Sequence, residues 1–175
     1  MTDSEIKAPT IMNVSLKYGL VSAVIGIVIF IARAIIDGNP FGKNWVFTVI
    51  SIGITIAVIV LAHREFKNNG NGYMSYGQGF KIGFMVTLVS FLISGIFTFI
   101  YTSFIDTELM NVFYDSQRAE MEAAGNMNDQ AIDTAIEWTQ KLFWPFFLIG
   151  GLFSSVLMGV VVPIFTQKKS PEPGI

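Results

Sequence analysis

The chain has 175 residues, of which 52% are apolar and 14% are charged, with a formal net charge of −2 and no cysteine. Ordinary soluble domains carry about 25% charged residues. This chain therefore has too few charges to cover the surface of a water-soluble globule. The composition excludes a disulfide framework and a cysteine-based metal site, and a net charge near zero gives no support for nucleic-acid binding.

Long apolar segments set the fold class. A helix that crosses the bilayer core needs roughly 17–25 mainly apolar residues, and in lipid its backbone polar groups must be bonded within the segment. Four segments meet this demand, at residues 18–36, 45–62, 82–105 and 142–167. The sequence therefore predicts an all-α, polytopic membrane protein whose four transmembrane helices form one domain over residues 1–175, with a flexible C-terminal tail over residues 168–175.

The first predicted span is not expected to be a signal peptide. Asp3 and Glu5 lie beside Lys7 in the leading segment, no cleavage site of the A-x-A type follows, and further spans come after it. This span carries one charge, Arg33, about one turn from its far end. We expect Arg33 to act as an anchor that reaches toward the lipid headgroups.

Basic residues near the span ends predict the orientation, because the side with more Lys and Arg faces the cytoplasm. One side, formed by the N-terminal segment, the link between the second and third spans and the C-terminal tail, holds Lys7, Lys17, Arg64, Lys67, Lys81, Lys168 and Lys169. The other side holds only Arg33, Lys43, Arg118 and Lys141. This asymmetry predicts that both termini are cytoplasmic and that residues 106–141 lie outside.

The predicted outer link, residues 106–141, is acidic and long. Leu109, Val112 and Phe113 are spaced to share one helix face, and Gly125 is placed to end that helix. Asn128 or Asp129 can cap a second segment, in which apolar residues recur at helical spacing. The link therefore predicts an extracytoplasmic amphipathic helical hairpin. It is the expected place for a partner or ligand, and the alternative is a solvated cap that only joins two spans.

Small and hydroxyl side chains follow one face of the third and fourth predicted spans. They recur at steps of three or four residues, which places them on one side of a helix. Such faces let helices approach closely and let hydroxyls bond across helices; the alternative interpretation is a polar-lined conduit. The residues are Gly79, Gly83, Thr87, Ser90, Ser94 and Thr98 along the third span and its lead-in, and Gly151, Ser155 and Gly159 in the fourth.

The chain has few residues suited to catalysis, metal binding or ion transport. The middle of every predicted span lacks ionisable residues, which disfavours an ion- or proton-coupled transporter. His63 stands beside Arg64 and Glu65 at a span end and is expected at the level of the headgroups. Pro163 should kink the fourth span, whereas Pro145 is expected near its start, where a missing N–H costs little. The sequence predicts no catalytic residue, no cofactor and no metal site.

The segment before the third span carries a motif. Its glycines depart by one residue from the dinucleotide fingerprint and follow no strand, so they do not predict a nucleotide site. The motif is Ser75, Tyr76, Gly77, Gln78, Gly79, Phe80 and Lys81. With it, the chain resembles a bacterial family of inner-membrane proteins catalogued as a domain of unknown function and common in Bacteroidetes-type bacteria. The resemblance covers nearly the whole chain and implies a four-span inner-membrane protein, but it supplies no catalytic residues.

Two functions remain open at this point. The preferred one is a non-enzymatic structural or interaction protein that acts through helix packing and its acidic outer hairpin, as a homo-oligomer or with a membrane-protein partner. The alternative is a small pore or carrier for an uncharged solute, lined by the Thr/Ser stripe of the third span. In both cases the expected surroundings are the lipid bilayer of a bacterial inner membrane, with no nucleic acid bound.

Overall fold

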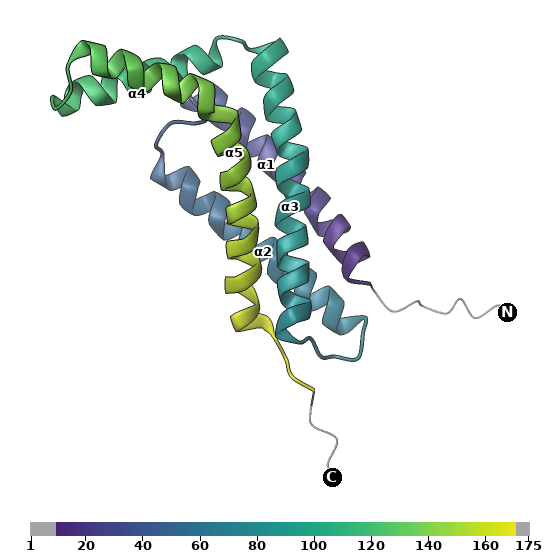
Figure 1. The fold of residues 1–175 in the computed structure, drawn as a ribbon. Coiled ribbons are helices and arrows are strands. Elements are labelled where there is room, and N and C mark those ends of the chain that lie inside the picture. The colour runs from purple at the N-terminus through teal and green to yellow at the C-terminus, as the bar shows by residue number, and fades with distance from the viewer. Residues whose placement is uncertain (1–9, 171–175) are drawn as a thin grey trace.

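The computed structural model describes residues 10–170, and this part of the chain is built from helices (Figure 1). In chain order they are α1 (Ile11–Ile36), α2 (Trp45–Asn68), α3 (Tyr76–Ile100), the π-helical turn η1 (Tyr101–Ile105), α4 (Leu109–Ala124) and α5 (Asp129–Thr166). No β-strand occurs within residues 10–170; Met74 and Lys168 form an isolated antiparallel bridge.

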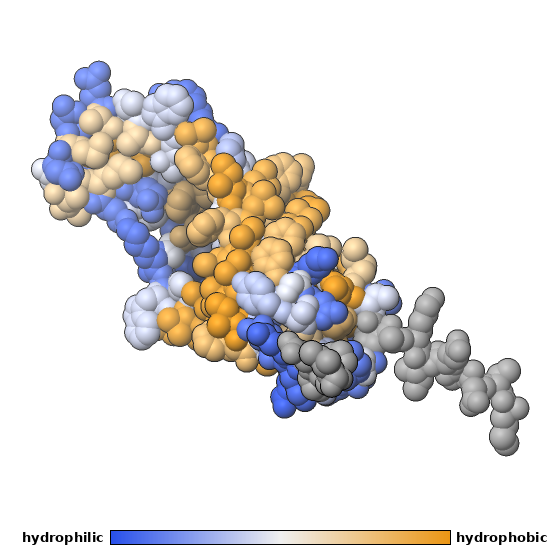
Figure 2. Space-filling view, turned by 60° about the horizontal axis from the view of Figure 1, so that its bottom comes forward, coloured by the Kyte–Doolittle hydropathy of each residue, from blue (hydrophilic) through white to orange (hydrophobic). Residues whose placement is uncertain are grey.

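Four helices are long and apolar enough to cross a membrane: α1, α2, α3 continued by η1, and α5. This confirms the predicted all-α class and the number of spans. On the face shown in Figure 2, apolar residues form a belt around the middle of the molecule, with hydrophilic residues at both ends. Many large apolar side chains on these helices are exposed, among them Val28, Val49 and Phe153, and a patch of this extent is typical of a surface that contacts a membrane or a protein partner.

The helices extend beyond the predicted spans, because hydropathy marks the apolar centre of a helix while its caps mark the ends. α1 begins at Ile11 instead of residue 18, after the Thr10 N-cap. α2 continues beyond residue 62 to residue 68. α3 begins at Tyr76 instead of residue 82, behind a capping box formed by Ser75 and Gln78. The 26 residues of α1 extend over about 39 Å, which exceeds the ~30 Å bilayer core and favours a tilted helix.

The largest difference from the prediction is in α5. The second helix of the hairpin and the fourth span form one helix of 38 residues, capped by Asn128. Pro145 therefore lies in a helix interior and not near a helix start, and its missing N–H leaves the carbonyl of Lys141 without its helical partner. Figure 1 shows α5 running beside α4 and then turning down along α3. A proline inside a helix explains a bend of this kind. Pro163 also lies inside α5, near its end.

The two ends of the molecule differ in structure. The α1–α2 turn and the α4–α5 hairpin lie at one end, named the hairpin end, and the start of α1, the α2–α3 turn and the end of α5 lie at the termini end (Figure 1). α1 packs most extensively on α3, and α3 packs on α5, while α2 is attached more lightly. The buried apolar core includes Val14, Ile59, Met74, Ile82 and Val162, which come from the termini half of the helices and from the α2–α3 turn.

The hairpin is closed by a glycine and an ion pair. α4 ends at Gly125, whose φ of 64° is left-handed and favours glycine. Arg118 of α4 donates a hydrogen bond to Asp133 of α5. This bond raises the pKa of the Arg118 guanidinium above its ordinary value, and burial raises the pKa of the Tyr114 hydroxyl.

The hairpin also packs on the α1–α2 turn. Phe41 lies edge-to-face with Phe113 of α4, at 5.7 Å between ring centroids, and with Phe143 of α5, at 5.2 Å. Lys43 pairs with Glu120 of α4. The hairpin is therefore attached to the bundle by an aromatic cluster and an ion pair.

The beginning of the predicted C-terminal tail is ordered against the bundle. Met74 and Lys168 exchange two backbone hydrogen bonds of 2.9 Å, so the first residue of that tail is fixed to the α2–α3 turn. The tail residues 171–175 lie outside the described residues, as does Lys7 from the orientation argument.

Candidate functional site

The predicted stripe of small residues divides into two parts. Its glycines lie at the contact between α3 and α5. A Cβ at Gly83 would lie 3.2 Å from the Cα of Gly159, and one at Gly159 would lie 3.1 Å from the carbonyl oxygen of Phe80. Gly79 lies against the end of α5, and a Cβ at Gly151 would overlap a phenylalanine ring of α3. These positions need glycine for close approach of two helices.

The hydroxyls of the stripe face different surroundings. Thr87 and Ser90 line a cavity near the middle of the bundle. Ser94 and Ser155 donate to carbonyls of their own helices, at 2.7 and 2.8 Å, and Thr98 is buried. These three are not among the residues that line the cavity, so the stripe does not act as one continuous polar surface.

The cavity beside Thr87 and Ser90, named the hydroxyl cavity, has a volume of about 450 Å³. All four long helices contribute to it, and none of its lining side chains is ionisable. Ser90 donates to Ser22 of α1 at 3.1 Å, whereas the hydroxyl of Ser154 has no hydrogen-bond partner within residues 10–170. Its lining is Ser22, Thr55, Thr87, Ser90, Phe91, Phe146, Phe147, Gly150, Gly151 and Ser154.

Toward the termini end, the helices are held together by buried side chains, among them His63. His63 is fully buried, its Nε2 lies 3.0 Å from the carbonyl oxygen of Gly79, and its Nδ1 lies 2.7 Å from Oγ1 of Thr166. Because a carbonyl only accepts, Nε2 carries a proton and donates to Gly79. One side chain of α2 thus binds both α3 and α5.

His63 is buried between α2, α3 and α5, while its expected depth, at the level of the headgroups, stays a prediction. The charged neighbours Arg64 and Glu65 suggested a helix end, but α2 continues past them. His63 lies four residues after Ile59, which is also fully buried, and residues four apart share a helix face. That spacing is the signal in the sequence that marks His63 as an interior residue.

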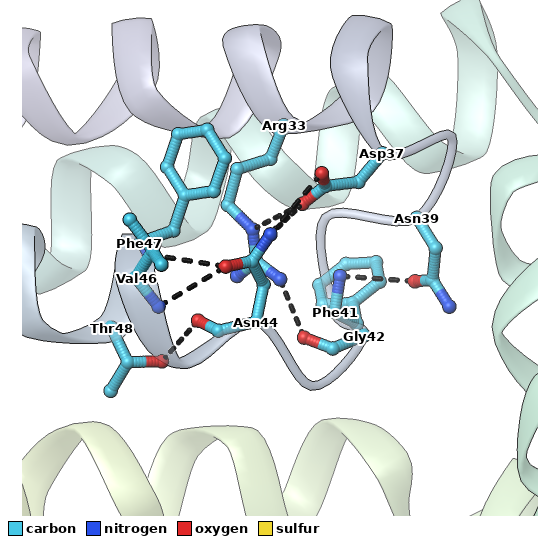
Figure 3. Close-up of polar contacts among 9 residues, drawn as sticks. All are labelled: Arg33, Asp37, Asn39, Phe41, Gly42, Asn44, Val46, Phe47 and Thr48. Carbon is cyan, nitrogen blue, oxygen red and sulfur yellow. Dashed lines mark hydrogen bonds and ion pairs between the residues drawn. The ribbon is translucent and has the colours of Figure 1, made fainter.

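Arg33 holds the turn at the hairpin end (Figure 3). Its Nη2 donates to the carbonyl of Gly42, and its Nε lies 3.5 Å from Asp37. Asn44 donates to both oxygens of Asp37, at 3.3 and 3.2 Å, and its own side-chain oxygen caps α2. The guanidinium also lies over the ring of Phe47, 5.7 Å from its centroid. The Arg33 side chain is only 16% exposed, so it is held by contacts within the protein, and its expected role as an anchor at the headgroups stays a prediction.

A second cavity, named the aromatic cavity, lies between this turn and the hairpin. It has a volume of about 590 Å³ and shares two residues, Phe146 and Phe147, with the hydroxyl cavity. Arg33 is the only ionisable side chain that lines it. The lining is Arg33, Pro40, Phe41, Phe113, Trp138, Thr139, Leu142, Phe143, Phe146 and Phe147. Sequence reasoning missed this cavity, because its walls come from three segments whose contact is a property of the tertiary structure.

The Ser75–Lys81 motif joins the start of α3 to the end of α5. Ser75 and Gln78 form the capping box, and the hydroxyl of Tyr76 donates to the carbonyl of Val160 at 3.0 Å. Gly77 has open space around it, and Lys81 is exposed. Within residues 10–170 no three His, Cys, Asp or Glu side chains are grouped to hold a metal ion. The motif positions helices and brings no reactive groups together.

Comparison with known proteins agrees with the resemblance found in the sequence. Searches among curated proteins and among solved structures give no match to this chain. A family model described as "Protein of unknown function (DUF4199)" matches residues 17–167. This range includes α1 from Lys17 onward, the whole of α2, α3 and α5, the residues that line both cavities, and the Ser75–Lys81 motif. The chain therefore belongs to the DUF4199 family of proteins of unknown function.

Proposed function

We propose that this protein is a non-enzymatic, multi-pass membrane carrier that binds a small uncharged solute in the hydroxyl cavity. The observation that supports this proposal is the placement of Ser22, Thr55, Thr87 and Ser90, from three helices, around one cavity in the middle of the apolar belt. Its volume of about 450 Å³ lies in the range of about 300–1,000 Å³ that is usual for small-molecule sites. A lining without ionisable side chains favours an uncharged ligand.

A carrier fits this arrangement better than an open pore. The aromatic cavity lies toward the hairpin end and shares the lining residues Phe146 and Phe147 with the hydroxyl cavity. Toward the termini end the bundle is closed by buried Ile59, Ile82 and His63. A pore needs both ends open, whereas a carrier closes one end while the other is accessible.

Removing two cavity hydroxyls should slow transport. In proteoliposomes, the Thr87→Val/Ser90→Ala double variant should take up radiolabelled glycerol and urea about tenfold more slowly than the parent protein, because each lost hydrogen bond is worth about 0.5–1.5 kcal/mol. The matched control is Ser94→Ala, since Ser94 follows Thr87 and Ser90 along α3 but does not line the hydroxyl cavity. Uptake by the parent protein that is no faster than in protein-free liposomes, or equal rates in the double variant and the parent, would contradict the proposal.

A second candidate is an interaction protein that acts through the acidic hairpin. Asp115, Glu122 and Asp129 are exposed on the hairpin, which is attached to the bundle at the α1–α2 turn. A photoreactive group at Asn126, near the hairpin tip, should then crosslink to one defined partner or to a second copy in native membranes. A strictly monomeric product without partners would argue against this candidate.

We also propose a bacterial inner-membrane location with both termini cytoplasmic, on the basis of the Lys and Arg asymmetry. Since the chain has no cysteine, single cysteines at Asn69 and Asn126 report on opposite ends of the bundle. In intact cells, an impermeant thiol reagent should label only Asn126→Cys, while both should react after permeabilisation. Labelling of only Asn69→Cys in intact cells would reverse the orientation.

A further inference from the structure

Arg33 in the aromatic cavity is a cation whose hydrogen-bonding capacity is not fully used. Its Nε and Nη2 bind Asp37 and Gly42, but within residues 10–170 no protein group accepts from its Nη1. The contact with Asp37 is long, at 3.5 Å, and both oxygens of that carboxylate also accept from Asn44. The mostly buried guanidinium therefore has a weak counter-ion, and both N–H donors of its Nη1 are free.

A second anion at Nη1 would complete this site. A buried charge is costly unless it is paired and hydrogen-bonded, and hydrogen bonds from guanidinium to carboxylate are among the strongest in proteins. The nearby cations Lys43 and Lys141 are paired with Glu120 and Glu137 and do not line the cavity. Arg33 is thus the group that would bind an anionic head.

The other walls of the cavity suit an apolar body. Six aromatic side chains line it, and three of them, Phe143, Phe146 and Phe147, follow one another along α5. The volume of about 590 Å³ is in the range of small-ligand sites and is too small for a whole diacyl phospholipid. Head and body must therefore belong to a smaller amphiphile.

We propose that the aromatic cavity binds a single-chain amphiphile with a carboxylate head, of the fatty-acid class. Its carboxylate accepts hydrogen bonds from Nη1 of Arg33, and its chain lies along Phe143, Phe146 and Phe147. This site differs from the hydroxyl cavity in charge and in ligand class, and it does not rest on the carrier function.

Trp138 lines the cavity and provides the measurement. The full-length protein with Trp45→Phe and Trp144→Phe, in phosphatidylcholine nanodiscs, has Trp138 as its single tryptophan. Titration with 9,10-dibromostearic acid should quench Trp138 fluorescence saturably, with half-quenching at a concentration at least tenfold lower than for 9,10-dibromostearyl alcohol. The alcohol has the same bromines and chain but no charge, so it controls for simple partitioning into the bilayer.

Two variants separate charge from space. Arg33→Gln should abolish the tenfold preference for the acid, because glutamine keeps a donor for the Gly42 carbonyl but has no charge. Thr139→Phe should remove the saturable quenching while Arg33 is kept, since the Thr139 hydroxyl donates only to its own helix and the larger ring fills the cavity. Circular dichroism checks the folding of both variants.

Three results would overturn the proposal. The first is equal half-quenching by the acid and the alcohol in the parent protein. The second is an unchanged preference for the acid in folded Arg33→Gln or in Thr139→Phe. The third is equally tight quenching by a nanodisc lipid, brominated phosphatidylglycerol, which would assign the cavity to a membrane phospholipid.

Discussion

Gly151→Ala should lower the free energy of unfolding by about 1–3 kcal/mol, the usual cost of inserting a group into a filled space. A Cβ at Gly151 of α5 would overlap the ring of Phe91 in α3. That ring is also packed on Phe147, at 5.3 Å between centroids, so moving it aside would disturb this second contact. Unfolding with sodium dodecyl sulfate in mixed micelles, followed by circular dichroism, measures the change.

The adjacent glycine provides the control. Gly150 lies in the same helix, but a Cβ there would have no neighbour within 4 Å. Gly150→Ala should leave stability unchanged or raise it by up to about 1 kcal/mol, because alanine is the better helix former. Equal effects of the two substitutions would show that the contact between α3 and α5 is not tight at Gly151.

His63→Ala should destabilise the termini end by about 2–4 kcal/mol, through a cavity and the loss of two buried hydrogen bonds. The imidazole connects α2 to Gly79 of α3 and to Thr166 of α5, and α2 has few other attachments to α5. Hydrogen exchange should therefore increase most in the last two turns of α2. The same detergent unfolding assay gives the magnitude.

Arg64→Ala is the matched control for His63. Arg64 is the next residue in α2 and is exposed, so its loss should change stability by less than about 0.5 kcal/mol. His63→Gln, which keeps one donor and one acceptor, should recover part of the loss. A stability in His63→Ala equal to that of Arg64→Ala would mean that the buried imidazole contributes nothing.

The sequence predicts well those features that local chemistry determines. Four runs of apolar residues without acidic residues gave four helices able to span a membrane, because a backbone in lipid must form its own hydrogen bonds. Gly125 predicted where one hairpin helix ends, and Asn128 or Asp129 predicted where the next begins; Asn128 is the cap. A left-handed C-cap and an oxygen-bearing N-cap have recognisable residue preferences.

Other features depend on which helix faces pack against each other, and the pattern of residues in a single sequence does not show which faces these are. The charges beside His63 suggested a helix end, although its ring lies between three helices. Because proline is tolerated in the first turn of a helix, Pro145 was expected near a helix start. Instead, the second hairpin helix continues into the fourth span as one helix, with Pro145 in its interior. Ser90 and Ser94 look equivalent in the stripe, yet only Ser90 lines the cavity, since that depends on where α1 and α5 lie.

The bend in α5 gives the hairpin a mechanical relation to the bundle. The part of α5 that precedes Pro145 is about 24 Å long at 1.5 Å per residue, and it joins the rest of the helix at a place where one helical hydrogen bond is missing. A rotation of about 10° there would carry the far end of this arm by about 4 Å, while Phe146 and Phe147, close to the pivot, would hardly be displaced. The helix would thus act as a lever that converts a small movement beside the two cavities into a large one at the hairpin tip.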